Sequence, residues 1–107
     1  MEKGEIWLVE LPSANGHEQA GMRPAVVISE VSGIVLIIPV TSNLMALRFD
    51  YSFSIKPSKS NGLASESVAM IFQLRAIDKK RLKKEIGILE AHYIEKIDDM
   101  MRKMMKL

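Results

Sequence analysis

Two apolar runs separated by a short turn limit the possible folds of this chain more than any other feature. The runs are PAVVISE (24–30) and IVLIIPVT (34–41), and the turn is VSG (31–33). A connection this short joins antiparallel strands, so the segment predicts a β-hairpin. Both runs are apolar at nearly every position, so we expect the hairpin to be covered on two faces, in a barrel or a sandwich. Pro39 cannot donate to a strand ladder and predicts an edge or a bulge.

Three further segments have the composition of strands. They are EIWLVEL (5–11), the alternating DYSFSI (50–55) and ESVAMIFQ (66–73). KPSKSNG (56–62) is rich in turn-forming residues and is expected to connect the last two. The first three quarters of the chain therefore predict an antiparallel β structure.

The periodicity changes in the last third of the sequence. Asp78 is suited to cap a short basic helix at 79–84, which a small strand at 85–88 would follow. Residues 90–106 predict an amphipathic helix, because apolar side chains recur at helical spacing along one stripe: Ile94, Ile97, Met101, Met104 and Met105. We therefore expect a single domain over residues 1–107, mainly β with appended helices, built as a small antiparallel β-barrel with a C-terminal helix.

Charge and composition limit the cellular compartments and the partners that the sequence predicts. The chain carries a formal net charge of +2 and no cysteine. Absence of cysteine fits a reducing compartment. The acidic N-terminus does not match a signal peptide, and no apolar run approaches the roughly 18 residues of a membrane span. We expect a cytoplasmic protein without a membrane segment. Basic residues concentrate at 79–84, which fits either a solvated face or contact with a nucleic acid or another partner.

Many classes of enzyme have recognisable sequence motifs, and this chain lacks those of several common classes. It contains no Walker loop, no GxGxxG and no GxSxG elbow, and its carboxylates are scattered rather than paired. The two histidines, His17 and His92, are far apart and have no carboxylates at metal-ligand spacing. An enzyme with this sequence is expected to work without a metal and without a cofactor.

Arg23 and Thr41 are the most suggestive polar residues, because both stand at the ends of predicted strands. Counted from a turn centred near Ser32, Arg23 lies nine residues back and Thr41 nine residues forward. A hairpin in that register brings the two side chains together at one end of the barrel. Pro24 also restricts the backbone of Arg23 to extended conformations. The alternative, a surface arginine and a turn threonine, stays open on spacing alone.

An arginine and a hydroxyl beside the polar loop that holds Glu18 and Gln19 would suit a phosphodiester. The guanidinium presents a fork of donors that matches phosphate oxygens. RNA carries its own nucleophile, the 2′-hydroxyl, so cleavage requires positioning, proton transfer and stabilisation of the charged phosphorane.

Several stretches of the sequence resemble the PemK/MazF family of toxin endoribonucleases from toxin–antitoxin systems. The matching stretches follow the family's order over almost the whole chain: GEIW (4–7), GHEQAGMRPAVVIS (16–29), IPVTS (38–42), GLASESVAMIFQLRAIDKKRL (62–82) and IGIL (86–89). The resemblance implies an SH3-like barrel of the PemK/CcdB type that forms homodimers. It also implies metal-independent cleavage of single-stranded RNA at short motifs, and a cognate antitoxin as partner.

The resemblance also assigns roles to individual residues. It implies catalytic roles for Arg23 and Thr41, and contact with RNA for six further residues: Glu18, Gln19, Ser42, Arg48, Gln73 and Arg75. The stretch NLMALRFD (43–50) departs from relatives, so it does not give the cleavage motif. The alternative is a non-enzymatic toxin on the same barrel, such as a gyrase poison, which acts through a Trp-bearing tail. The single tryptophan here is at position 7, which weakens that alternative.

Overall fold

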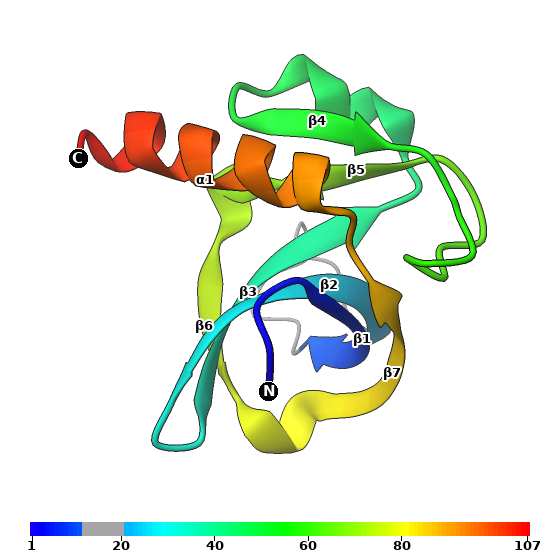
Figure 1. The fold of residues 1–107 in the computed structure, drawn as a ribbon, viewed down its shortest axis with the longest axis vertical. Helices are drawn as coiled ribbons and strands as arrows, with labels where there is room; N and C mark the ends of the chain where they lie inside the picture. The colour runs from blue at the N-terminus through cyan, green and yellow to red at the C-terminus, as the bar shows by residue number, and fades with distance from the viewer. Residues whose placement is uncertain (12–20) are drawn as a thin grey trace.

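Seven strands and one α-helix make up the part of the chain that the computed structural model describes, residues 1–11 and 21–107 (Figure 1). In chain order these elements are β1 (Glu5–Leu11), β2 (Gly21–Val31), β3 (Ile34–Thr41), β4 (Ser52–Ile55), β5 (Ser67–Met70), β6 (Arg75–Asp78), β7 (Leu82–Ile88) and α1 (Ala91–Met105). Three short 3₁₀ helices accompany them: η1 (Leu44–Arg48), η2 (Ile71–Gln73) and η3 (Lys79–Arg81). The prediction of a mainly β protein with a C-terminal helix is confirmed.

The strands form one bent antiparallel sheet in the order β4-β5-β3-β2-β1-β7, and β6 pairs with β3. β3 is the central strand. Its first half pairs with β6, where Ile34 lies opposite Asp78. Its last residue, Thr41, pairs with Val68 of β5. The outermost strands, β4 and β7, do not pair with each other within the described residues, so the predicted barrel is an open one.

The β2–β3 hairpin has a tighter turn than predicted, and a bulge compensates for the difference. Val31 pairs with Ile34, so the turn contains only Ser32 and Gly33, both with positive φ (52° and 83°), as a two-residue hairpin turn requires. The register then shifts by one between Val27 and Ser29 of β2. The bulge predicted at Pro39 therefore lies on the partner strand. Pro39 is not on an edge strand; it pairs with Ala25 at the last recorded step of this ladder.

The nearly continuous apolar pattern of the hairpin arises because both faces of the sheet are covered. On β2, Val26 belongs to one buried cluster and Val27 to another. On β3, Ile38 and Ile37 divide in the same way. Successive residues of a strand point to opposite faces of the sheet, which explains why neighbouring side chains belong to different clusters. All four side chains are fully or almost fully buried. The prediction of a hairpin covered on two faces is confirmed.

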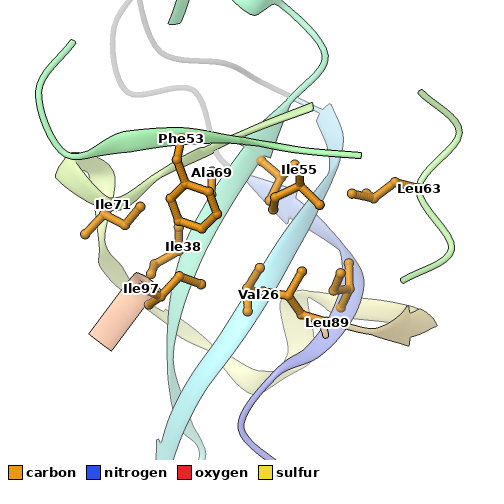
Figure 2. Packing of buried hydrophobic residues seen from close by; sticks show 11 residues of the cluster. Val26, Ile38, Phe53, Ile55, Leu63, Ala69, Ile71, Leu89 and Ile97 are labelled. Atoms are coloured by element: carbon orange, nitrogen blue, oxygen red, sulfur yellow. The ribbon is translucent and has the colours of Figure 1, made fainter. Parts of the chain in front are cut away.

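The larger cluster lies between β4, the hairpin and the C-terminal helix. Figure 2 shows Phe53 and Ile55 of β4 pointing toward the hairpin strands, and Ile97 of α1 reaching the same cluster. Three methionines of α1 pack against this cluster at its border: Met101 and Met104 of the predicted stripe, and Met100 beside it. Core packing therefore explains most of that stripe. Met105 is 45% exposed and does not take part.

The basic segment 79–84 is not the predicted helix. Asp78 does act as a cap, because its carboxylate accepts the N–H of Lys80 at 2.9 Å, but η3 ends at Arg81. Leu82 then pairs with Val9 of β1 and packs against the second cluster. Partial burial of this one leucine within an otherwise charged run favours a strand, and β7 begins there instead of at residue 85.

Other boundaries differ from the predicted ones for local reasons. β4 begins at Ser52, because Tyr51 takes a positive φ of 61° that ends the extended backbone before it. β5 ends at Met70, and the remainder of the predicted 66–73 strand turns into η2. β6 (RAID) carries two charged residues in four, so its sequence gave no strand signal.

The connection at 56–62 is more ordered than its turn-rich sequence suggests, and Asn61 is its centre. Asn61 is fully buried. Its side-chain oxygen accepts the N–H groups of Ser58 and Leu63, each at 3.0 Å. Its amide group donates to the carbonyl of Lys56 at 2.9 Å and to the carboxylate of Glu90 at 3.1 Å. One side chain therefore ties the connection to itself and to the residue that precedes α1.

Replacement of Asn61 is expected to destabilise the fold. Asn61→Ala would leave buried backbone groups without partners, at a cost of about 2–4 kcal/mol. Chemical denaturation measures this as a fall in the free energy of unfolding. Ser54→Ala on β4, where the serine makes no recorded side-chain hydrogen bond within the described chain, is the control and should change stability little. Equal stabilities of the two variants would contradict the role given to Asn61.

Candidate functional site

Two cavities open on either side of the end of β3. The first, of about 350 Å³, is lined by residues of β2, of the end of β3 and the residue after it, of the segment before β5 and of the start of β5: Met22, Arg23, Pro24, Val40, Ser42, Leu63, Ala64, Ser65 and Ser67. The second, of about 370 Å³, is lined by Thr41, Asn43, Met45, Ala46, Arg48, Phe49, Met70, Phe72 and Gln73. Consecutive residues of β3 face different cavities, as the alternation of a strand requires.

Arg23 enters the first cavity from the start of β2. It pairs with Val9 of β1 and is half-buried. Its Nε atom is buried and has no hydrogen-bond partner among the described residues. A buried guanidinium nitrogen without a partner is costly unless a ligand supplies an acceptor. The same cavity holds three serines, Ser42, Ser65 and Ser67, of which only Ser42 was predicted as a site residue. The hydroxyl of Ser67 donates to the carbonyl of Ser65 at 2.9 Å.

Thr41 faces the second cavity and is only 3% exposed. Its hydroxyl oxygen accepts the N–H of Asn43 at 3.1 Å, which bends the chain from β3 toward η1. Arg48 and Gln73, both exposed and both predicted to contact RNA, line this cavity as well.

The predicted cross-strand neighbours Arg23 and Thr41 do not pair. The β2–β3 ladder is recorded only as far as Ala25 opposite Pro39, two residues short of them. Beyond that point β3 pairs with β5. The two residues remain at the same end of the hairpin but line different cavities.

The other predicted residues divide as follows. Ser42 joins Arg23, whereas Arg48 and Gln73 join Thr41. Arg75 lies on β6 opposite Ile37, half-buried, and lines neither of these cavities. Glu18 and Gln19, with His17, lie outside the described residues.

The basic segment is partly neutralised by acidic neighbours. Lys79 forms an ion pair with Glu30 at 3.0 Å, and Arg81 approaches Glu10 at 3.7 Å. These pairs are exposed and contribute little to stability, but they reduce the positive field that the sequence implies. Within residues 1–11 and 21–107, no group of three histidine or acidic side chains is placed to hold a metal ion. The same residues include no helix long and apolar enough to cross a membrane.

Comparison with solved structures identifies the fold as that of MazF toxins. MazF (Form-I) from Deinococcus radiodurans superposes with a TM-score of 0.80 at 21% identity, covering 100% of this chain and 97% of that one. An endoribonuclease in complex with its cognate antitoxin from Mycobacterial species superposes with a TM-score of 0.70 at 15% identity, covering 98% and 92%.

Sequence comparison extends this from fold to family. The model of the PemK-like, MazF-like toxins of type II toxin–antitoxin systems matches residues 2–105. The chain is also 33% identical over 113 aligned residues to "Endoribonuclease MazF9" of Mycobacterium tuberculosis, covering 95% of this chain and 93% of that protein. The chain belongs to this toxin family.

Proposed function

We propose that this toxin is an endoribonuclease that cleaves single-stranded RNA, including mRNA, at a short sequence motif without a metal ion. The observation that carries the proposal is the combination of family membership with the position of Arg23. The relative at 33% identity is named an endoribonuclease. Arg23 lines a cavity with three serines, a set of donors suited to a phosphate.

In the proposed reaction the 2′-hydroxyl oxygen of the substrate attacks the adjacent phosphorus. A new O–P bond forms and the bond from phosphorus to the 5′-oxygen breaks. The products are a 2′,3′-cyclic phosphate and a 5′-hydroxyl, and the proton lost by the nucleophile balances the one gained by the leaving oxygen. Arg23 stabilises the negative charge of the phosphorane rather than moving the proton, because a guanidinium is a poor acid and a poor base at neutral pH.

Thr41 is proposed to contact the same substrate from the other side of β3, at the phosphate or the 2′-hydroxyl. Its oxygen already accepts one hydrogen bond from Asn43, and its hydroxyl hydrogen is left to donate. Ser42, Arg48, Gln73 and Arg75 are proposed to contact RNA around these two residues, together with Glu18 and Gln19.

The proposal includes partners and a location. The structural neighbours include an endoribonuclease in complex with its cognate antitoxin, so we propose an antitoxin for this chain as well. A homodimer is proposed on the same basis of family membership. We also propose a cytoplasmic location, because the proposed substrate includes mRNA.

Incubation of the purified protein with a long RNA in EDTA tests the proposed function. We expect discrete fragments with 5′-hydroxyl ends, and sequencing of those ends gives the motif. RNA left intact by a correctly folded protein would overturn the proposal. Inhibition of gyrase in the same preparation would then favour the non-enzymatic toxin.

Thr41→Val is expected to reduce the cleavage rate roughly tenfold or more, because it removes a hydroxyl while keeping the shape of the side chain. Thr41→Ser retains the hydroxyl and should keep most of the activity. Single-turnover cleavage of a short RNA measures both. If Thr41→Val cleaved as fast as the unchanged protein, Thr41 would have only a structural part in the bend before η1.

A further inference from the structure

Methionine supplies all the sulfur of this chain, because the sequence has eight methionines and no cysteine. Four of the eight side chains are exposed: Met1, Met22, Met45 and Met105. The thioether of an exposed methionine can be oxidised to a sulfoxide, which changes a flexible apolar side chain into a polar one. Met22 and Met45 each line one of the two cavities at the end of β3. Half of the exposed methionines therefore belong to the candidate site.

Met22 is the exposed methionine that shares a cavity with Arg23. It precedes Arg23 on β2 and pairs with Glu10 of β1, so an ordered strand holds it at this position. The residue is 49% exposed and belongs to neither of the two buried clusters of the described chain. Core packing therefore does not account for a methionine here, and the proposed cleavage does not use it.

Oxidation of Met22 would place a new hydrogen-bond acceptor, the sulfoxide oxygen, at the lining of this cavity. The donors there include the guanidinium of Arg23, whose buried Nε has no hydrogen-bond partner among the described residues, and the hydroxyl of Ser42. A guanidinium has five N–H donors and no acceptor, so it binds whichever oxygen acceptor is in reach. The sulfoxide oxygen would therefore compete with a phosphate oxygen for the same donors.

We propose that Met22 is a modification site: hydrogen peroxide oxidises its thioether to the sulfoxide, and the oxidised toxin binds RNA more weakly and cleaves it more slowly. The inference rests on the proposed function, since it adds a redox-sensitive group to the same cavity. It assigns to Met22 no part in the cleavage reaction itself.

The oxidation and its reversal are both two-electron steps. The sulfur attacks one oxygen of the peroxide, an S–O bond forms and the O–O bond breaks. The second oxygen leaves as water, so the sulfur loses two electrons and the peroxide gains them. A methionine sulfoxide reductase restores the thioether with two thiols, which become a disulfide while the sulfoxide oxygen leaves as water. The modification is therefore reversible.

Peptide mass mapping after treatment with hydrogen peroxide tests the modification itself. We expect Met22 to gain one oxygen atom well before Met70, which lines the second cavity but is buried. Met105 is the positive control, because it is exposed at the end of α1 and lines neither cavity. A Met22 that stays unmodified after Met105 is fully oxidised would overturn the proposal.

Binding of a non-cleavable RNA measures the consequence independently of catalysis. The probe is a pool of short single strands with 2′-O-methyl groups, which lack the nucleophile, and Kd is compared before and after peroxide for each protein. We expect Kd to rise roughly tenfold, about the effect of one hydrogen bond to a charged group, and to recover after treatment with methionine sulfoxide reductases. Met22→Leu should show no change on oxidation, whereas Met45→Leu should respond as the unchanged protein does.

The matched variants decide which methionine is responsible. If oxidised Met22→Leu lost as much affinity as the unchanged protein, the assignment to Met22 would fail. It would also fail if circular dichroism traced the loss to unfolding, which would assign the effect to the methionines of α1. If the unoxidised protein bound the pool but left RNA intact, the proposed function would fail while the Kd comparison still decided the role of Met22. A protein that neither bound nor cleaved RNA would contradict both.

Discussion

Arg23→Ala is expected to abolish detectable RNA cleavage and to leave the fold intact. Removal of one preorganised charged group aimed at the developing phosphorane costs on the order of a hundred- to a thousand-fold in rate. Arg23 stands at the start of β2 rather than in either buried cluster, so the truncation should not collapse the core. Cleavage is measured under single-turnover conditions, and the fold is checked by circular dichroism and thermal unfolding.

Arg23→Lys is the matched control for this prediction. Lysine keeps the positive charge but loses the planar fork that can pair two phosphate oxygens at once. We expect intermediate activity: above that of Arg23→Ala, because the charge remains, and below that of the unchanged protein, because the geometry is lost. If Arg23→Ala folds and cleaves at the normal rate, the first cavity is not the site of phosphate chemistry and the assignment of Arg23 fails.

The hairpin could be predicted from sequence because its signals agree with one another. Two apolar runs, a Ser-Gly turn and residues buried on both faces all favour the same structure, and the observed hairpin retains it. The register was harder to predict. The true turn is one residue shorter than expected, so the pairs nearest the turn are offset by one residue from the predicted register. A bulge near Ile28 removes this offset, and the pairs from Val27–Ile37 to Ala25–Pro39 are the predicted ones. No pattern in the sequence marks that bulge.

The candidate site could be predicted only in part. Arg23 and Thr41 were correctly placed at one end of the hairpin, but their division between two cavities depends on β3 passing from β2 to β5 after Pro39. That exchange of partners is a tertiary feature that spacing along the chain does not encode. The position of Phe72 could not be predicted from spacing either. The sequence predicts a strand there, whereas Phe72 lies in η2 and its ring contacts Phe49.

The connection at 56–62 shows a different limit. Serine, asparagine and glycine are frequent in turns because they tolerate irregular backbone, so this sequence predicts only a turn-rich connection. In the structure its backbone lies directly against β7: Ser60 and Ile88 exchange two hydrogen bonds of 2.8 Å, one of them through the serine hydroxyl. Four residues that follow the connection form one wall of the cavity that contains Arg23: Leu63, Ala64, Ser65 and Ser67. The connection therefore positions part of the candidate site.

Gly87→Ala is expected to be the most destabilising single-methyl addition in the described chain outside positions of positive φ. Gly87 lies on β7 with its Cα facing the connection. A Cβ at this position would overlap the carbonyl group of Asn61 and the carbonyl oxygen of Ser60. These are backbone atoms, so no side-chain rotation relieves the overlap. The two segments would have to separate, and the hydrogen bonds between Ser60 and Ile88 would be lost with the contact.

The cost of Gly87→Ala should be about 3 kcal/mol or more, at the upper end for overpacking, which in a chain of this size lowers Tm by more than about 10 °C. Differential scanning calorimetry measures the shift. Ile88→Ala, on the next residue of the same strand, is the control, because the Ile88 side chain is 55% exposed and its backbone bonds to Ser60 do not depend on it. A Tm for Gly87→Ala equal to that of the control would mean that the connection can move away from β7 at little cost. If instead Gly87→Ala remains folded below its lowered Tm but cleaves RNA slowly, the wall from Leu63 to Ser67 depends on this contact for its position beside Arg23.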